Sequence, residues 1–423
     1  MSDTTDTGPV LAADGTPLKR SLARALRRQK IRALMLVAPL LLFVLLTFIM
    51  PIGDMLFRSV ENNIVKDTLP KTVVALRDWD PDSGEIPDEA VFAALAEDLK
   101  VAVESKTHTR LGTRLNYELT GISSLFRKSG RKIKKWDLAQ DGPFQAKFID
   151  LNDGWGEIAT WRTIKTYSPK YTNGYFLNSI DMQKGTNGAE ARPENQQIYI
   201  TLFKRTMFMS MVITISCIVL AYPVAWILAN LPARTSNLLM ILVLLPFWTS
   251  LLVRTSAWKV MLQQQGVINE TLVWLGLVSD TDRLVMINNQ FGTIVAMTHI
   301  LLPFMILPMY SVMQTIQPTY LRAAKSLGAT NWTAFWRVYF PQSIPGIGAG
   351  SILVFILSIG YYITPELVGG TKGVFISNRI AFHISSSLNW GLAAALGAIL
   401  LAVVLILYWA YDKIVGIDNV KLG

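Results

Sequence analysis

The sequence predicts an all-α polytopic membrane protein that has six transmembrane helices and a large hydrophilic insertion after the first of them. Of its 423 residues, 51% are hydrophobic and 17% are charged, and 21 of the 30 acidic residues lie between residues 54 and 194. The rest of the chain is therefore apolar enough to lie in lipid. It contains six apolar runs of about 20 residues, the length that spans a bilayer. We place these runs at residues 33–52, 207–231, 238–261, 292–316, 347–363 and 391–411.

Residues 1–32 form a basic tail, and residues 33–53 form the first transmembrane helix. Lys and Arg concentrate in the cytoplasmic segments of membrane proteins, so we expect the N-terminus in the cytoplasm. Threading six helices from that side places Arg234, Arg322 and Lys413 in the cytoplasm as well. Topology alone accounts for these cations, and the alternative of a tail that binds anionic lipid or nucleic acid is not required.

Residues 54–200 form the insertion, which this topology places on the outer face. Its 20 basic and 21 acidic residues nearly cancel, so the net charge of +10 resides in the segments that flank the membrane. Helical spacing of apolar residues predicts one helix over residues 91–102 and a second through residues 111–125. The aromatic, turn-rich residues 136–175 predict strands, and residues 179–195 a linker. We therefore expect an α+β insertion, followed by five helices in residues 201–423.

Residues 318–347 form a polar, helix-prone loop between two apolar runs. Pro318 suits the first turn of a helix, and Gly328 lies where a helix end favours a left-handed residue. Thr330 or Asn331 can cap a second helix, which we expect to end at Pro341 and Pro345. The sequence thus predicts two short helices with an elbow at the glycine. The second helix carries an aromatic stripe made of Trp332, Phe335, Trp336 and Tyr339.

This loop resembles the cytoplasmic coupling loop of binding-protein-dependent ABC importer permeases, which has the pattern Glu-Ala-Ala, two residues, Leu-Gly-Ala and a proline-rich close. Arg322 stands where that family usually has the glutamate, so the groove of a partner ATPase would need a compensating acid. The alternative is an interfacial amphipathic hairpin without a partner. The matching positions are Ala323, Ala324, Leu327, Gly328, Ala329, Phe335, Val338, Pro341, Pro345, Gly346 and Ile347.

Other segments resemble the spermidine/putrescine-type permeases within this family. They are the Leu-Pro-Phe-Trp-Thr-Ser run at residues 245–250, Arg254 with residues 257–258 and 266–269, the Thr-Pro-Glu-Leu-Val-Gly-Gly run at residues 364–370, and residues 389–395. These matches extend from about residue 205 to the end, which is roughly half of the chain. The insertion has no counterpart in the short members of that group.

The resemblance implies a permease subunit of a type I ABC importer in the bacterial inner (cytoplasmic) membrane. Its implied partners are an ABC ATPase dimer, a second permease subunit, a periplasmic solute-binding protein and the lipid bilayer, with no nucleic acid. The sequence has no Gly-x-x-x-x-Gly-Lys-Ser/Thr phosphate loop. We therefore expect ATP and Mg on the partner ATPase, and no catalytic residue, cofactor or metal in this chain. The implied solute is a polyamine or a related small cation; the alternatives are another small solute, or a membrane-anchored receptor or scaffold with a periplasmic sensing module.

Glu366 is the acid that we place on the solute path. It follows Pro365, near the outer end of the fifth apolar run, and an ionisable residue at such a break faces protein or water rather than lipid. With Tyr361 and Tyr362 it can offer a carboxylate and two ring faces to a polyammonium solute. The alternative is a helix-end acid that is satisfied by local backbone or a neighbouring arginine. Two further path candidates are Trp248 and His299, although a histidine in a span is also commonly a satisfied polar group.

Overall fold

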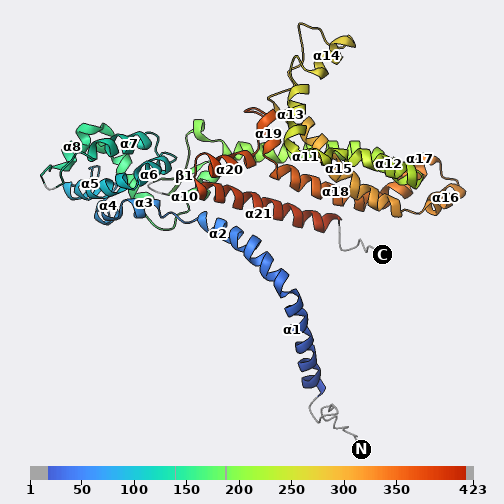
Figure 1. The fold of residues 1–423 in the computed structure, drawn as a ribbon, viewed down its shortest axis with the longest axis horizontal. Helices are drawn as coiled ribbons and strands as arrows, with labels where there is room; N and C mark the ends of the chain where they lie inside the picture. The colour runs from blue at the N-terminus through green and yellow to red at the C-terminus, as the bar shows by residue number, and fades with distance from the viewer. Residues whose placement is uncertain (1–17, 139, 186–187, 416–423) are drawn as a thin grey trace, which may run out of the picture. The chain divides into compact units, whose positions relative to one another are not determined.

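A computed structural model describes residues 18–138, 140–185 and 188–415 (Figure 1). They belong to two compact units, Met1–Phe57 and Arg58–Gly423. The first unit is an apolar helix made of α1 (Leu18–Val44), the π-turn η1 (Leu45–Ile49) and α2 (Met50–Arg58). Residues 18–32 of the predicted tail are thus already helical, and residues 1–17 lie outside the described residues.

A π-turn precedes a proline at two places in the chain. A proline ring lacks an N–H and clashes with the carbonyl four residues before it. In η1, before Pro51, the N–H of Met50 reaches back five residues to the carbonyl of Leu45. The same arrangement occurs in η5 (Phe335–Tyr339), where the N–H of Phe340 bonds to Phe335 ahead of Pro341. The wider turn lets each helix continue through its proline.

The insertion is a helical module with its own core. Its largest buried side chains are aromatic, and Phe92 and Trp161 meet edge to face with ring centroids 4.7 Å apart. The indole N–H groups of Trp155 and Trp161 donate to Ser129 and to the carbonyl of Trp155. The elements are α3 (Ile64–Thr68), α4 (Pro70–Ala75), α5 (Glu89–Glu104), α6 (Thr107–Leu115), α7 (Ile122–Ile133), α8 (Phe144–Leu151), η2 (Asp153–Gly156), α9 (Ile158–Thr166), α10 (Gly174–Ser179), β1 (Met182–Gly185), β2 (Gly188–Ala191) and η3 (Glu194–Gln196).

The predicted secondary structure of the insertion is partly wrong. The helix predicted over residues 91–102 is confirmed as α5, but residues 111–125 form two helices, because the left-handed Gly121 (φ 106°) ends the turn between them. Residues 136–175 are helical rather than strands. Their buried aromatic residues, such as Phe144 and Phe148, recur at helical spacing, and burial at that spacing outweighs the β-propensity of the residue type.

The strands of the insertion lie instead in the predicted linker. β1 and β2 form one antiparallel hairpin, with Met182 opposite Ala191. Just before it, Asp181 accepts hydrogen bonds from the backbone N–H groups of Ile198, Tyr199 and Ile200 at 2.8–3.0 Å. This carboxylate therefore satisfies the first turn of the next helix, α11.

The two ends of the insertion also meet. The N–H of Asn62 donates to Lys170, and the N–H of Thr172 donates to Val60, both at 2.8 Å.

The membrane part contains, among the described residues, four further helices that are long and apolar enough to span a bilayer, besides the N-terminal one. The helices α11, α15 and α18 pack against one another around a shared core. α18 approaches α15 closely at Gly346, where an added Cβ would lie 3.1 Å from the Cα of Met309. The elements are α11 (Tyr199–Asn230), α12 (Ala233–Leu244), η4 (Leu245–Trp248), α13 (Leu251–Met261), α14 (Val267–Trp274), α15 (Gln290–Thr315), α16 (Pro318–Ser326), α17 (Asn331–Ala334), η5, α18 (Phe340–Gly360), α19 (Ile363–Val368), α20 (Ile376–Ser385) and α21 (Trp390–Val415).

The third predicted helix is not continuous. Residues 238–261 fall on α12, η4 and α13, and the axis bends by 93° between η4 and α13. Pro246 lies in the short 3₁₀ turn, Thr249 is extended, and the Ser250 side chain starts a new helix by accepting the N–H of Val253. Six spans therefore result only if this bent pair counts as one span.

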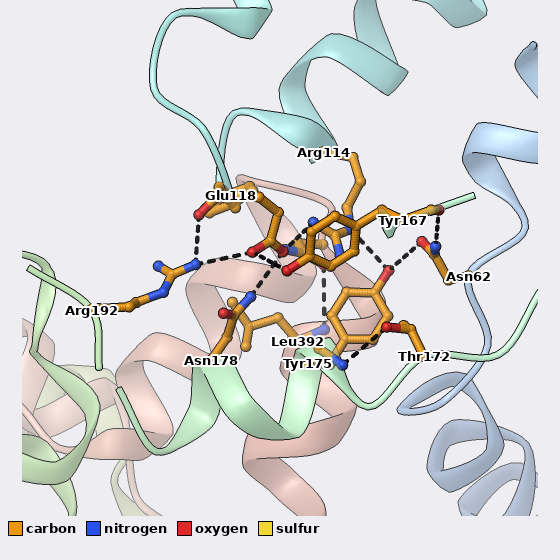
Figure 2. Close-up of polar contacts among 12 residues, drawn as sticks. Asn62, Arg114, Glu118, Tyr167, Thr172, Tyr175, Asn178, Arg192 and Leu392 are labelled. Atoms are coloured by element: carbon orange, nitrogen blue, oxygen red, sulfur yellow. Dashed lines mark hydrogen bonds and ion pairs between the residues drawn. The ribbon is translucent and has the colours of Figure 1, made fainter. Parts of the chain in front are cut away.

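A buried polar network holds the base of the insertion together (Figure 2). At its centre is Glu118, whose side chain is 3% exposed and forms ion pairs with Arg114 at 2.7 Å and Arg192 at 3.2 Å. Its oxygens also accept hydrogen bonds from Tyr167 and Asn178. Burial and the Glu118 carboxylate raise the pKa of Tyr167, so that hydroxyl remains a donor. Residues far apart in sequence are thus joined at one carboxylate.

The same network reaches the last transmembrane helix through Tyr175. The hydroxyl of Tyr175 accepts a hydrogen bond from Nε of Arg114 at 3.0 Å, and its ring lies against Gly391 in the first turn of α21. A Cβ at Gly391 would lie 2.3 Å from that ring, so only glycine fits. Tyr175 also shares a buried cluster with Leu392 and Leu396. The insertion is therefore packed directly on α21.

We expect Glu118→Gln to destabilise the insertion. The change removes the charge that compensates two buried guanidinium groups, and breaking a buried ion pair in this way costs about 3–5 kcal/mol. Thermal unfolding of the purified chain by circular dichroism measures the effect. The exposed pair Lys71 and Glu97 supplies the control, and Glu97→Gln should leave the transition in place. An unchanged transition for Glu118→Gln would contradict a stabilising role of the network.

We expect Gly391→Ala to loosen the packing of the insertion on α21. The added methyl group displaces the ring of Tyr175 and with it the bond to Arg114. Limited proteolysis of the β1–β2 hairpin should then become faster. Gly397→Ala is the matched control, because a Cβ at Gly397, on the same helix, meets no heavy atom within 4 Å. Equal cleavage rates in both variants would show that the contact does not hold the insertion.

Candidate functional site

The elbow predicted at Gly328 is present in the structure. α16 ends with Gly328 in the left-handed region (φ 91°), and its N–H bonds to the carbonyl of Lys325 at 2.9 Å. The N–H of Ala329 bonds to Ala324 at 3.1 Å, which completes a Schellman motif. Thr330 then caps α17 by accepting the N–H of Thr333. Both sides of the elbow are thus defined by backbone hydrogen bonds.

The loop presents an apolar surface to its surroundings. Leu327 at the elbow is 90% exposed, and Trp332 and Trp336 are 72% and 44% exposed. The aromatic stripe is divided between two environments, because Tyr339 is buried and Phe335 packs on Tyr222 of α11. Leu327 precedes the candidate span Asn331–Gly360, while Trp332 and Trp336 lie in its first two turns; exposed apolar residues grouped at such a position are typical of a docking surface. Arg322 and Ala323 are also exposed, Ala324 and Ala329 are half-buried, and α16 buries no residue.

The expectation that Pro341 and Pro345 end the second helix is wrong. α17, η5 and α18 form one helix from Asn331 to Gly360. Pro341 is the second residue of α18 and lies inside this continuous helix, where the π-turn before it removes the clash with the preceding turn. The second half of the loop predicted at residues 318–347 is therefore the start of the fifth predicted span rather than the second arm of a separate hairpin. In the second unit, α16 and α17 lie at the opposite end of the bundle from the insertion (Figure 1).

Glu366 lies in the first turn of α19, just past the other end of that long helix. It is exposed, and its Oε2 accepts a hydrogen bond from Nδ2 of Asn378 at 2.6 Å. Asn378 also donates to the carbonyl of Tyr362, and Ser377 donates to that of Tyr361. The structure thus brings Glu366, Tyr361 and Tyr362 together where α18, α19 and α20 meet. The partner of the acid is an amide, neither local backbone alone nor an arginine.

The other two path candidates lie on different elements. Trp248 is 77% exposed at the bend after η4. His299 is on α15, where its Nδ1 accepts the indole N–H of Trp258 at 3.1 Å. Neither has a recorded contact with Glu366 in the described part of the chain. On α13, Nε and Nη1 of Arg254 are buried without a hydrogen-bond partner among the described residues.

A polar hollow of about 490 Å³ opens among the loops that follow α13 and precede α15 and α20. Its lining contains one charged residue, Lys372, and no acid. The other lining residues are Gln263, Gln264, Val285, Ile287, Asn288, Asn289 and Thr371.

Sequence reasoning did not single out the residues that hold these sites in place. Ser377 and Asn378 bond to carbonyls 16 residues earlier, and the partners of Glu118 are up to 74 residues away. No local sequence pattern predicts hydrogen bonds or ion pairs between residues so far apart. The one local signal is the i,i+4 spacing of Arg114 and Glu118 on a predicted helix, which does not identify Arg192, Tyr167 or Asn178 as further partners.

The comparisons with known proteins concern the membrane part. The sequence profile of the family described as "Binding-protein-dependent transport system inner membrane component" matches residues 204–415. A crystal structure of a bacterial ABC transporter involved in the import of alginate aligns with 53% of this chain and 80% of that chain, at 19% identity and a TM-score of 0.43. The insertion lies outside the profile match.

Three curated relatives show the same extent of similarity. The spermidine/putrescine transport system permease protein PotB of Escherichia coli (strain K12) is 34% identical over 220 residues, which cover 51% of this chain and 79% of that protein. PotB of Salmonella typhi is also 34% identical, and the match covers 76% of it. The inner membrane ABC transporter permease protein YdcU of Escherichia coli (strain K12) is 34% identical over 235 residues, 53% of this chain and 73% of that protein. With a profile that spans half of its length and relatives at 34% identity that it covers over 73–79% of theirs, the chain belongs to the binding-protein-dependent inner-membrane components, the permease subunits of ABC importers.

Proposed function

We propose that this permease subunit moves a polyamine, or a related small cationic solute, from the periplasm to the cytoplasm. The observation that carries the proposal is the similarity to the PotB proteins at 34% identity. The exposed carboxylate of Glu366 just past the end of α18, with the exposed Tyr362 four residues before it, supports it, because carboxylates and aromatic side chains attract ammonium groups. The subunit positions and releases the solute, and no covalent step on the solute is involved.

The partners follow from the family. An ABC ATPase dimer binds ATP and Mg and docks on residues 318–347, a second permease subunit completes the path, and a periplasmic binding protein delivers the solute. In this arrangement the N-terminus and the coupling loop are cytoplasmic, and the insertion is periplasmic. The exposed Leu327, Trp332 and Trp336 supply the apolar contact with the ATPase. An acid in the ATPase groove pairs with Arg322.

Energy is coupled through the long helix that joins the two sites. The run from Asn331 to Gly360 has 30 residues, and at 1.5 Å per residue it is roughly 45 Å long. One end leaves the elbow at Gly328, and the other ends beside Tyr361 and Glu366. A displacement of the loop by the ATPase therefore moves the far end of the helix, where the solute-facing carboxylate lies. The π-turn and the two prolines are the points at which this helix can bend.

A second candidate solute is a small anion. The hollow lined by Lys372 and four amide side chains offers one positive charge and several N–H donors, without an acid. A relative at 27% identity is named as a probable sulfate transport system permease, from Zygnema circumcarinatum. Uptake assays with labelled spermidine and labelled sulfate, in cells that express the whole transporter, distinguish the two candidates.

Gly328→Val tests the coupling loop. Valine is strained in the left-handed region, so the elbow distorts while the spans stay intact. We expect loss of solute uptake and of solute-stimulated ATP hydrolysis, with normal insertion into the membrane. Gly276→Val is the matched control, since Gly276 also has a positive φ (69°) with open space around it but lies outside the loop. Normal uptake by Gly328→Val would sink the assignment of this loop as the ATPase contact.

Glu366→Gln tests the solute path. Glutamine keeps an oxygen acceptor for Asn378 and removes only the charge. A hydrogen bond to a charged group contributes about 1.5–3 kcal/mol, so spermidine uptake should fall at least about tenfold with unchanged assembly. Asp282→Asn, the same charge change at an exposed outer loop, should leave uptake unaffected. Unchanged kinetics in Glu366→Gln would reduce the residue to a structural role and weaken the polyamine proposal.

A further inference from the structure

A cleft of about 680 Å³ lies where the insertion meets the turn between α20 and α21. One wall comes from residues 61–68 and 107–117 of the insertion, and the other from residues 386–391. Its volume is within the range of about 300–1,000 Å³ that is usual for small-molecule sites. Neither the coupling loop nor Glu366 lines it, so it is a separate site.

Two buried side chains that line the cleft have N–H groups without a hydrogen-bond partner among the described residues. They are Nη2 of Arg114 and Nδ2 of Asn389, in residues that are 6% and 5% exposed. The remaining polar side-chain atoms are engaged: Arg114 donates to Tyr175 and Glu118, and Oδ1 of Asn389 accepts the N–H of Leu392. Buried donors are rarely left unpaired, so the cleft is suited to a ligand with acceptor oxygens.

The charge of the cleft favours an oxyanion. Burial alone would lower the pKa of Arg114, but Tyr175 and Glu118 outweigh it and raise the pKa, so the guanidinium stays charged. A guanidinium and an amide that line the same cleft can match the oxygens of a phosphate or carboxylate. The cleft is slightly basic overall, since its charged lining residues are Arg58, Arg110 and Arg114 against Glu61 and Asp67.

The position of the cleft at the end of a span favours a phosphate over a carboxylate ligand. Trp390, which also lines it, is the first residue of the span Trp390–Lys413. The ends of spans lie at the level of the lipid headgroups, where tryptophan is enriched. We propose that the cleft binds a phosphate group, which bridges the insertion to α21 through Arg114 and Asn389. Its source is the phosphodiester of a phospholipid headgroup or free phosphate. The proposal does not depend on which solute is transported.

The test uses the purified full-length chain in detergent and its thermal unfolding midpoint. Three probes are added separately: dioleoylphosphatidylglycerol, dioleoylglycerol and inorganic phosphate. A rise in the midpoint with phosphatidylglycerol, but not with dioleoylglycerol, identifies a lipid phosphate as the ligand. A rise with inorganic phosphate supports the site with a soluble ligand. No rise with either phosphate probe, or equal rises with both lipids, overturns the proposal.

Asn389→Asp separates the site from general lipid binding. Aspartate keeps the oxygen that accepts from Leu392 but replaces the free donor with a charge that repels phosphate. It should raise the half-saturating phosphatidylglycerol concentration, or phosphate concentration, about tenfold or more. The matched control is Asn152→Asp, because Asn152 likewise accepts a backbone N–H at a helix start, that of Gly154, away from the cleft. An identical response of the wild type and Asn389→Asp contradicts the site.

Discussion

The membrane part depends on one constraint: a backbone that crosses lipid must satisfy its own hydrogen bonds, even where proline removes a donor. The chain meets it by widening the helix ahead of Pro51 and Pro341 into a π-turn. At Pro341 the result is a single helix that follows the elbow at Gly328 and reaches Tyr361 at its other end. Had Pro341 ended the helix, a break would lie between the elbow and residues 361–366.

A second constraint fastens the insertion. Burying the carboxylate of Glu118 is tolerable only because two guanidinium groups, a phenol and an amide surround it. Arg114 comes from α6, Asn178 from α10, Tyr167 from the residue after α9 and Arg192 from the residue after β2, so the network forms only when all four segments are in place. Tyr175 connects this network to α21, because its hydroxyl is bonded to Arg114 and its ring packs against Gly391. The insertion is thereby joined to a transmembrane helix by this polar network together with the apolar cluster of Tyr175, Leu392 and Leu396.

Features with local signals could be predicted from the sequence. Gly328 and Thr330 define the elbow through their own backbone preferences, and both behave as expected. The apolar runs identified most spans by length alone. The secondary structure was predicted wrongly where burial or a helix cap determines it. Residues 136–175 are helical because their aromatic residues are buried at helical spacing. The third predicted span bends because the side chain of Ser250 starts a new helix. The partners of Glu118, and those of Asn378, could not be predicted, because in both cases the fold brings together residues that lie far apart in the sequence.

The pairing of residues 60–62 with residues 170–172 closes most of the insertion on itself. Val60 and Asn62 are hydrogen-bonded to Thr172 and Lys170, so the segment between them begins and ends at one place. A segment whose ends meet can be lengthened or shortened without moving the elements on either side. The carboxylate of Asp181 then satisfies the start of α11, just before the family match begins at residue 204.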